Sequence, residues 1–173
     1  MPKPIQGTYP AYFENYVSQV PETELSDAFK NQSAIVNSFF DGIDEEKSKY
    51  AYAPGKWTIK ELMQHMIDAE RIFNYRSLCF ARNEQASLPN FEEKDYAVNS
   101  NANNRSWKEL CNELKAVRTA TELLFKSFNE EMLNRSGLAN NKPATVNALG
   151  FITVGHLYHH KKIIESRYLS KYN

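Results

Sequence analysis

Four long segments with apolar residues at helical spacing constrain the fold of this chain more than any other feature of its sequence. Within each segment the apolar residues recur three or four positions apart, the pattern of a helix with one buried face. Polar turns separate the segments, and the chain contains no internal repeat or low-complexity linker. We therefore expect an all-α fold in which these helices pack as a four-helix bundle.

The first two helices have recognisable ends. We expect the first over about residues 22–40, followed by Gly42, a residue that tolerates the positive φ of many helix C-termini. The second is expected to begin at Thr58, whose spacing to Glu61 is that of a capping box, and to reach about residue 82.

A polar, Asn-rich loop is expected over residues 83–105. Connections longer than about 12–15 residues without structure of their own are uncommon and often act as lids or binding loops. The third helix follows, opened by a second capping-box candidate at Ser106 and Glu109. After a polar turn around residues 134–141, the fourth helix is expected to begin near residues 143–145 and to reach about residue 169.

The bulk composition fits one domain over residues 1–173, with the motifs in about residues 20–170. Lys plus Arg and Asp plus Glu both number 21, so no net field attracts nucleic acid or an anionic membrane. No secretory signal or membrane-length apolar run occurs, and we expect a cytoplasmic protein. Cys79 and Cys111 lack CxxC spacing and are interpreted as small buried hydrophobes.

Three of the four histidines lie within residues 156–160. Side chains four residues apart on a helix project to the same side, so His156 and His160 can reach one metal ion. On a helical wheel of about 100° per residue both fall near the middle of the apolar arc. His159 falls at its edge, where solvent, a loop or a partner of the metal ligands would meet it.

A metal site needs a third ligand, and His65 is the remaining histidine. It borders the apolar arc of the second helix, so it can meet the histidine pair if the two helices are neighbours. Three neutral imidazoles suit a divalent ion, with zinc or nickel expected. The alternative is that these are core or interface histidines whose hydrogen bonds are satisfied by nearby side chains. Spacing alone leaves both interpretations open.

Several polar residues are candidate helpers. Glu61 and Asp68 lie one turn before and after His65 and could orient its free ring nitrogen, or simply form a solvated flank. Arg76, on the same side of the helix, could meet an acidic substrate group, but a structural pairing with Glu70 or another carboxylate is favoured.

Two further sets of residues belong to the ends and loops of these helices. Asp95 and Tyr96 lie in the 83–105 loop and are expected near the mouth of the site. Trp57 and Trp107, at the starts of the second and third helices, are interpreted as anchoring aromatics.

Five motifs follow one another over about residues 50–170: KWTIKELMQHMIDAER, LPNFEEKDYA, NRSWKEL, GLANNKPATVNAL and GHLYHHKKIIESRY. In the order and spacing of these motifs the chain resembles the DinB-like superfamily of bacterial four-helix proteins. The resemblance implies an up-down-down-up bundle, frequently homodimeric, that binds a divalent metal through one histidine of the second helix and an HxxxH pair on the last. Those positions here are His65, His156 and His160.

The resemblance also implies a range of activities. Characterised members include transferases that attach low-molecular-weight thiols such as bacillithiol to electrophiles and isomerases that use mycothiol, and many others are described as metal-dependent hydrolases without a known substrate. We expect a metal-dependent transferase or hydrolase acting on a small molecule, with a low-molecular-weight thiol as a candidate partner. The alternatives are a non-catalytic metal- or ligand-binding bundle and a structural module without a metal. A fold does not fix a substrate.

Overall fold

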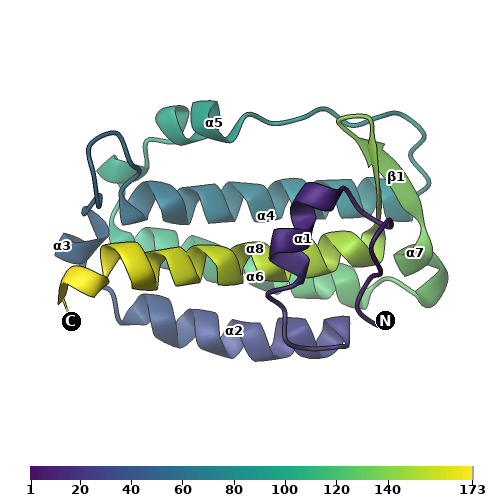
Figure 1. Cartoon of the computed structure of the whole chain (residues 1–173), viewed down its shortest axis with the longest axis horizontal. Helices are drawn as coiled ribbons and strands as arrows, with labels where there is room; N and C mark the ends of the chain where they lie inside the picture. The colour runs from purple at the N-terminus through teal and green to yellow at the C-terminus, as the bar shows by residue number, and fades with distance from the viewer. Residues whose placement is uncertain (173) are drawn as a thin grey trace.

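The computed structural model describes residues 1–172 and contains the four expected long helices (Figure 1). These are α2 (Leu25–Asp41), α4 (Ile59–Ala81), α6 (Trp107–Lys126) and α8 (Val146–Ile163). Between and around them lie shorter elements: η1 (Ala11–Phe13), α1 (Glu14–Val17), α3 (Glu45–Ser48), α5 (Glu93–Asn99), η2 (Ala102–Asn104), α7 (Glu130–Asn134), β1 (Ser136–Ala139), β2 (Lys142–Thr145), η3 (Ile164–Tyr168) and η4 (Ser170–Tyr172).

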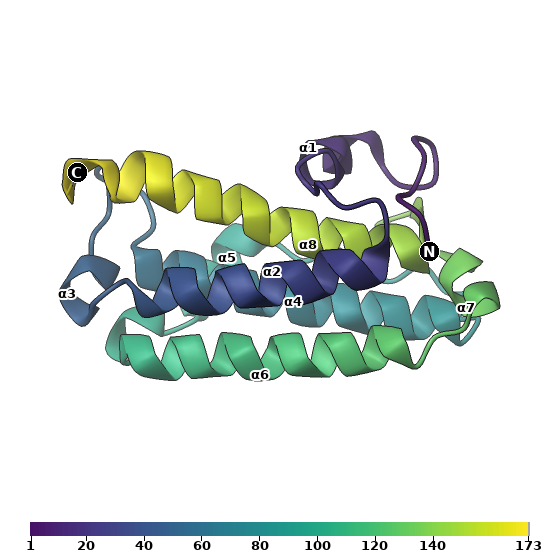
Figure 2. The ribbon, with the colours of Figure 1, turned by 90° about the horizontal axis from the view of Figure 1, so that it is seen from below.

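The helix directions confirm the expected topology. Followed along the colour bar, α2 and α8 run towards the end of the bundle that carries α3 and the C-terminus, whereas α4 and α6 run away from it (Figures 1 and 2). The order is therefore up-down-down-up. No helix in the described part of the chain is both long and apolar enough to cross a membrane.

This topology accounts for the long 83–105 connection. Because α4 and α6 are parallel, the chain must return along the length of α4, about 34 Å at 1.5 Å per residue, before α6 begins. The connection is not structureless, as it contains α5 and η2, and Leu88 pairs with Ala139 of the hairpin. Its path places α5 beside α4 (Figure 1).

The predicted capping boxes are both confirmed. The side chains of Thr58 and Ser106 each accept a hydrogen bond from the backbone N–H of the glutamate three residues later, and the carboxylate of that glutamate accepts one from the backbone N–H of the cap residue. The expectation for Gly42 is wrong, because it has a φ of −79° and ends α2 in the right-handed region.

The polar turn before the last helix is a two-stranded antiparallel hairpin, which the helical pattern did not predict. Its two-residue loop, Asn140 and Asn141, has φ values of 51° and 57°. Positive φ at both loop residues is the type I′ geometry that matches the twist of paired strands, and asparagine adopts it readily. As a result, Pro143 and Thr145 belong to β2, and α8 starts at Val146.

Helix α8 is buried around most of its circumference along its first three turns. The amino-terminal segment causes this, because α1 packs across α8 on the side that the wheel assigned to the edge of the apolar arc (Figure 2). A Cβ on Gly155 would lie 2.1 Å from the backbone oxygen of Tyr16, so α1 and α8 touch backbone to backbone there.

The centre of the bundle contains a buried ion pair. Arg118 of α6 donates through Nε and Nη2 to the two carboxylate oxygens of Glu70 on α4, at 2.8 Å each. Its Nη1 donates to Gln32 of α2, whose amide donates to the carbonyl oxygen of Val154 on α8. This network joins all four long helices. Both cysteines are free thiols; Cys111 is buried, as predicted, whereas Cys79 is only partly buried.

Candidate metal centre

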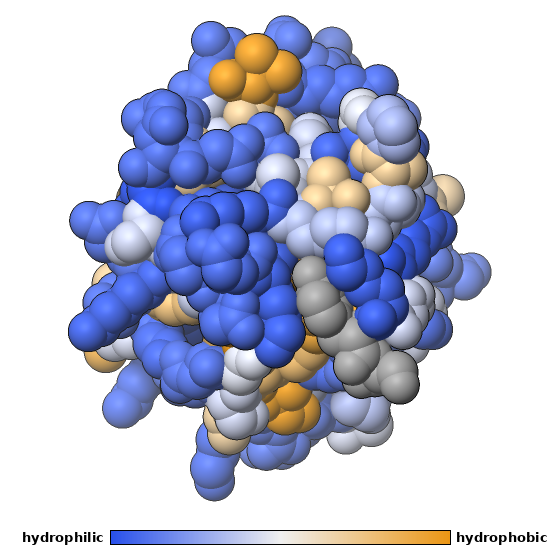
Figure 3. All heavy atoms as spheres, turned by 90° about the vertical axis from the view of Figure 1, so that its left-hand side faces the viewer, coloured by the Kyte–Doolittle hydropathy of each residue, from blue (hydrophilic) through white to orange (hydrophobic). Residues whose placement is uncertain are grey.

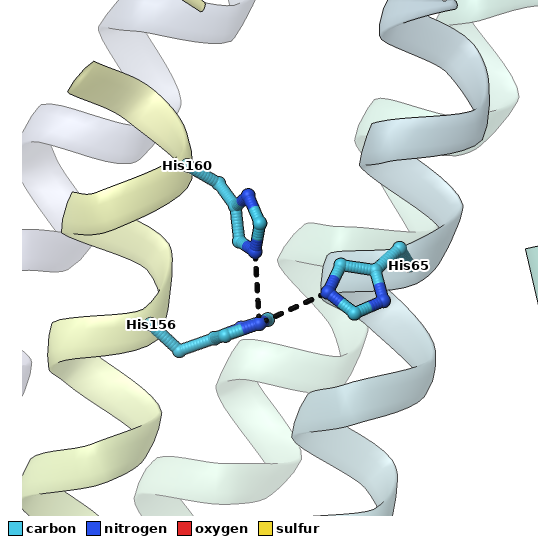
Figure 4. Close-up of side chains that lie close together, drawn as sticks. All are labelled: His65, His156 and His160. Atoms are coloured by element: carbon cyan, nitrogen blue, oxygen red, sulfur yellow. Dashed lines mark hydrogen bonds between the residues drawn. The ribbon is translucent and has the colours of Figure 1, made fainter. Parts of the chain in front are cut away.

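Three histidines meet between α4 and α8. His65 comes from the second turn of α4, and His156 and His160 come from adjacent turns of α8 (Figure 4). The Nε2 atom of His156 lies 3.1 Å from Nε2 of His65 and 3.0 Å from Nε2 of His160. The candidate ligand atoms of all three lie within 4.8 Å of one another, and all three side chains are buried.

Burial keeps these imidazoles neutral. It lowers the pKa of His65 to about 4, with a smaller contribution from the charge of His159. The pKa values of His156 and His160 are also well below the usual value, first through burial and then through the neighbouring histidines. Neutral imidazoles are the form that binds metal ions, so no proton has to leave before ligation at neutral pH.

The contact between three ring nitrogens fits a cation. A neutral imidazole nitrogen carries either one proton or one lone pair, so Nε2 of His156 cannot form good hydrogen bonds to both neighbours. Metal–nitrogen bonds of about 2.0–2.1 Å place two neighbouring nitrogen ligands of one ion roughly 3 Å or slightly more apart. The separations of 3.0 and 3.1 Å between the histidine nitrogens are of this size. These residues therefore fit a divalent ion.

Aromatic rings enclose the three histidines. The ring of Trp57 lies 5.1 Å from that of His65, between centroids. Tyr16 and Phe73 present their edges or faces to His156 at 5.2 and 5.8 Å. Tyr16 belongs to α1 and was not assigned from the sequence, because its segment is too short to carry a helical pattern.

Glu93, the first residue of α5, was also missed. Its Oε2 lies 3.9 Å from Nε2 of His65, and its side chain is 53% exposed. It lines the opening above the histidines together with Glu92, in the same LPNFEEKDYA segment from which Asp95 and Tyr96 were chosen, and of the two glutamates it is the one that approaches His65. Nothing in the sequence distinguishes the acid of that segment that approaches the histidines.

The two carboxylates beside His65 on α4 have other partners. Glu61 accepts from the backbone N–H of Thr58 at 2.7 Å as part of the capping box. Asp68 accepts from the amide of Gln64 at 2.9 Å. Both bonds stabilise the flank of α4, the second of the two roles that the sequence left open.

Arg76 does not pair with Glu70, since Arg118 holds that carboxylate. Arg76 is buried and donates to the carbonyl oxygen of Pro89 at 3.0 Å, which fastens the long connection to α4. Asp95 and Tyr96 line a hollow between α5 and α4 together with Asp68, rather than an opening onto the histidines.

The remaining sequence candidates have clear positions. His159 is partly buried, with Nδ1 3.3 Å from the side-chain amide nitrogen of Gln19 and its ring 5.1 Å from that of Tyr16. Its ring lies 5.1 Å from that of His160, but it is not one of the three histidines whose ligand atoms converge, in agreement with the helical wheel. Trp107 is buried and donates to the carbonyl oxygen of Phe40 at 3.2 Å, so it is an anchor, as predicted.

A bundle of this topology with a buried cluster of three histidines defines a class of helical proteins suited to a divalent metal ion. The family model of the DinB superfamily matches residues 28–164, and the chain belongs to that superfamily. YfiT from Bacillus subtilis, described as "a probable metal-dependent hydrolase with an unusual four-helix bundle topology", has a similar structure. The TM-score is 0.72 at 13% identity, covering 94% of this chain and 89% of YfiT, which shows a shared fold. No curated protein matches.

Proposed function

We propose that this chain is a metal-dependent enzyme that acts on a small molecule, with His65, His156 and His160 as the metal ligands. The observation that carries the proposal is the convergence of three neutral Nε2 atoms beneath an opening to solvent. A divalent ion held by neutral ligands keeps its full charge, so it polarises a substrate and lowers the pKa of a water or thiol that reaches it. The description of YfiT as a probable hydrolase supports the same class.

Hydrolysis is the reaction we favour, because of Glu93. A hydrolytic site needs a base near the attacking water. The Glu93 carboxylate is half-exposed and 3.9 Å from His65 Nε2, within reach of a water beside the cluster. It takes one proton from that water as the water oxygen bonds to the substrate carbonyl carbon, and then passes the proton to the leaving group.

Thiol transfer is the second candidate. A doubly charged ion with neutral ligands also stabilises a thiolate, and this reaction needs no base once the thiol is deprotonated. The two candidates therefore differ in what they require of Glu93.

A matched pair of variants separates these reactions. Glu93→Gln and Glu92→Gln remove neighbouring carboxylates that line the same opening, but only Glu93 approaches His65. Metal-loaded proteins would be assayed on ester and amide substrates and on thiol–electrophile pairs. We expect Glu93→Gln to lose about 100-fold or more in hydrolysis, in the range of a general base, and Glu92→Gln to retain it.

The outcomes distinguish three functions. Loss of hydrolysis in Glu93→Gln alone supports the hydrolase. Thiol transfer that survives both substitutions supports the transferase. If no substrate is turned over faster by metal-loaded than by metal-free wild type, the proposal of an enzyme fails and a non-catalytic metal-binding bundle is left.

We also propose a single domain, because both core clusters include residues of α4 and α8. That the chain forms a homodimer stays a prediction, which the molar mass measured by light scattering would test.

A further inference from the structure

Two separate openings reach the histidine cluster. The first, of about 280 Å³, reaches His65 and His156. The second, of about 320 Å³, reaches His160 from the end of the bundle that carries α3 and the C-terminus. Glu93 lines both. That end of the molecule faces the viewer in Figure 3, where hydrophilic side chains surround small apolar areas.

The second opening, hereafter the basic opening, is lined by three cationic side chains, Lys56, Lys94 and Arg167. No ion pair with a carboxylate is formed by any of the three within residues 1–172. The three side chains come from different parts of the chain, yet they line the same hollow. Their charges add at that hollow.

Arg167 is held in place there. Its Nη1 donates to the hydroxyl oxygen of Tyr52 at 3.2 Å, and its guanidinium carbon lies 5.6 Å from the centre of the Tyr52 ring. A guanidinium has five N–H donors in a fixed plane, so most of them stay available for an oxyanion. Lys56 follows Gly55, whose φ of 72° turns the chain ahead of Trp57.

The walls of the basic opening are aromatic and fixed. The hydroxyl of Tyr168 donates to the carbonyl oxygen of Trp57 at 2.9 Å, and the Tyr52 and Tyr168 rings meet edge to face at 4.9 Å. Trp57 also packs on His65. A flat or apolar carbon skeleton would contact these rings while its charged group meets the cations.

The first opening, hereafter the acidic opening, has the opposite character. It is lined by Glu92 and Glu93 and by rings of η1, α1 and α4, without a lysine or arginine among its described lining residues. An anion is repelled there and attracted at the basic opening, since like charges raise and opposite charges lower its energy. The two openings therefore discriminate by charge.

We propose that the basic opening binds the anionic group, a carboxylate or phosphate, of a substrate whose apolar part lies against Trp57 and whose reactive part reaches His160. The anion site itself does not need the metal. The inference rests on the proposed function only in treating the bound anion as a substrate. It assigns an anionic substrate class to the site and leaves the acidic opening for a neutral co-substrate or for water.

Trp57 provides the assay. The chain has two tryptophans, and the other, Trp107, is buried in the core, so a ligand in the basic opening should change the emission of Trp57 alone. Metal-free and metal-loaded protein would be titrated with benzoate, with its neutral analogue benzamide, and with inorganic phosphate as a competitor. Trp57→Phe shows whether the signal comes from the opening.

The charge variants are Arg167→Gln and Lys94→Gln, with Lys162→Gln as the matched control. Lys162 is exposed near the end of α8, five residues before Arg167 of η3, but it lines a different hollow. We expect benzoate to bind more tightly than benzamide. Each substitution at the opening should weaken benzoate binding by up to about five-fold, as single exposed charges do, and added salt should weaken it further in wild type.

Equal binding of benzoate and benzamide would overturn the proposal, as would an equal effect of Lys162→Gln. These outcomes are independent of the metal. If benzoate binding follows the expected pattern in metal-free protein but the histidines bind no metal, the anion site stands and the proposed enzyme function fails. If metal binds and the charge variants have no effect, the enzyme function stands and the anion site fails.

Discussion

Gly155 marks the point where α1 crosses α8 beside the histidine cluster, and replacing it with alanine tests that crossing. Inside a helix, Gly→Ala ordinarily increases stability by about 1 kcal/mol. Here the new Cβ would lie 2.1 Å from the oxygen and 2.5 Å from the carbonyl carbon of Tyr16. Ordinary carbon–oxygen contacts are about 3.3 Å or longer, so α1 must move by more than about 1 Å.

The size of the expected loss of stability depends on whether the atoms that the new Cβ contacts can move. The obstacle is backbone, and Tyr16 is also packed against His156 and His159, so it cannot simply rotate aside. Overpacking of this kind costs about 1–3 kcal/mol, and we place this case at the upper end. After the helix-propensity gain, we expect a net loss of about 1–2 kcal/mol. At about 2–4 °C per kcal/mol for a chain of this size, Tm falls by several degrees.

Gly150→Ala is the matched control on the same helix. Its Cβ would approach the side-chain ends of Leu25 and Phe125, at 2.7 and 2.8 Å, and these can shift. Urea unfolding of the metal-free variants measures both free energies. We expect Gly155→Ala to be at least about 1 kcal/mol less stable than Gly150→Ala. A Gly155→Ala protein as stable as wild type or more stable would refute the contact between α1 and α8.

Three further predictions concern the free energy of unfolding and use the same measurement. Arg118→Leu removes the cation that pairs with the buried Glu70 carboxylate and should lower the free energy of unfolding by about 3–5 kcal/mol. The Arg118→Leu/Glu70→Leu double variant should recover part of that loss, and additive losses would contradict the pairing. Thr58→Ala removes the cap of α4 and should cost about 1 kcal/mol. Gly137→Ala would place a Cβ 2.1 Å from the fully buried ring of Phe80, so we expect a loss of about 1–3 kcal/mol. An unchanged free energy of unfolding would show that the hairpin does not pack on Phe80.

The sequence predicted the features of the fold that depend on local chemistry. Helix starts at Thr58 and Ser106 were found because a capping box is a relation between residues three apart. The convergence of His156 and His160 was found because helical spacing places residues four apart on one side. The hairpin was missed, although Asn140 and Asn141 are a recognisable type I′ signal, because the adjoining strands are only four residues each.

What the sequence could not supply were contacts between distant segments. Nothing in the local sequence shows that α1 covers α8, or that Arg118 rather than Arg76 pairs with Glu70. Nor does it show that Glu93 approaches His65 while Asp95 lines a separate hollow beside α4. Each depends on the return path of the 83–105 connection and on the amino-terminal segment. Trp57 was assigned to packing alone for the same reason, whereas its ring adjoins His65.

The central claim is that His65, His156 and His160 hold one divalent metal ion, and metal content after equilibrium dialysis tests it most directly. Wild-type chain, His160→Ala and His159→Ala would be dialysed against zinc or nickel and then against metal-free buffer. We expect about one ion per chain in wild type and in His159→Ala, whose ring lies outside the cluster, and close to none in His160→Ala. Retention of the ion by His160→Ala, or its loss from His159→Ala, would contradict the assignment.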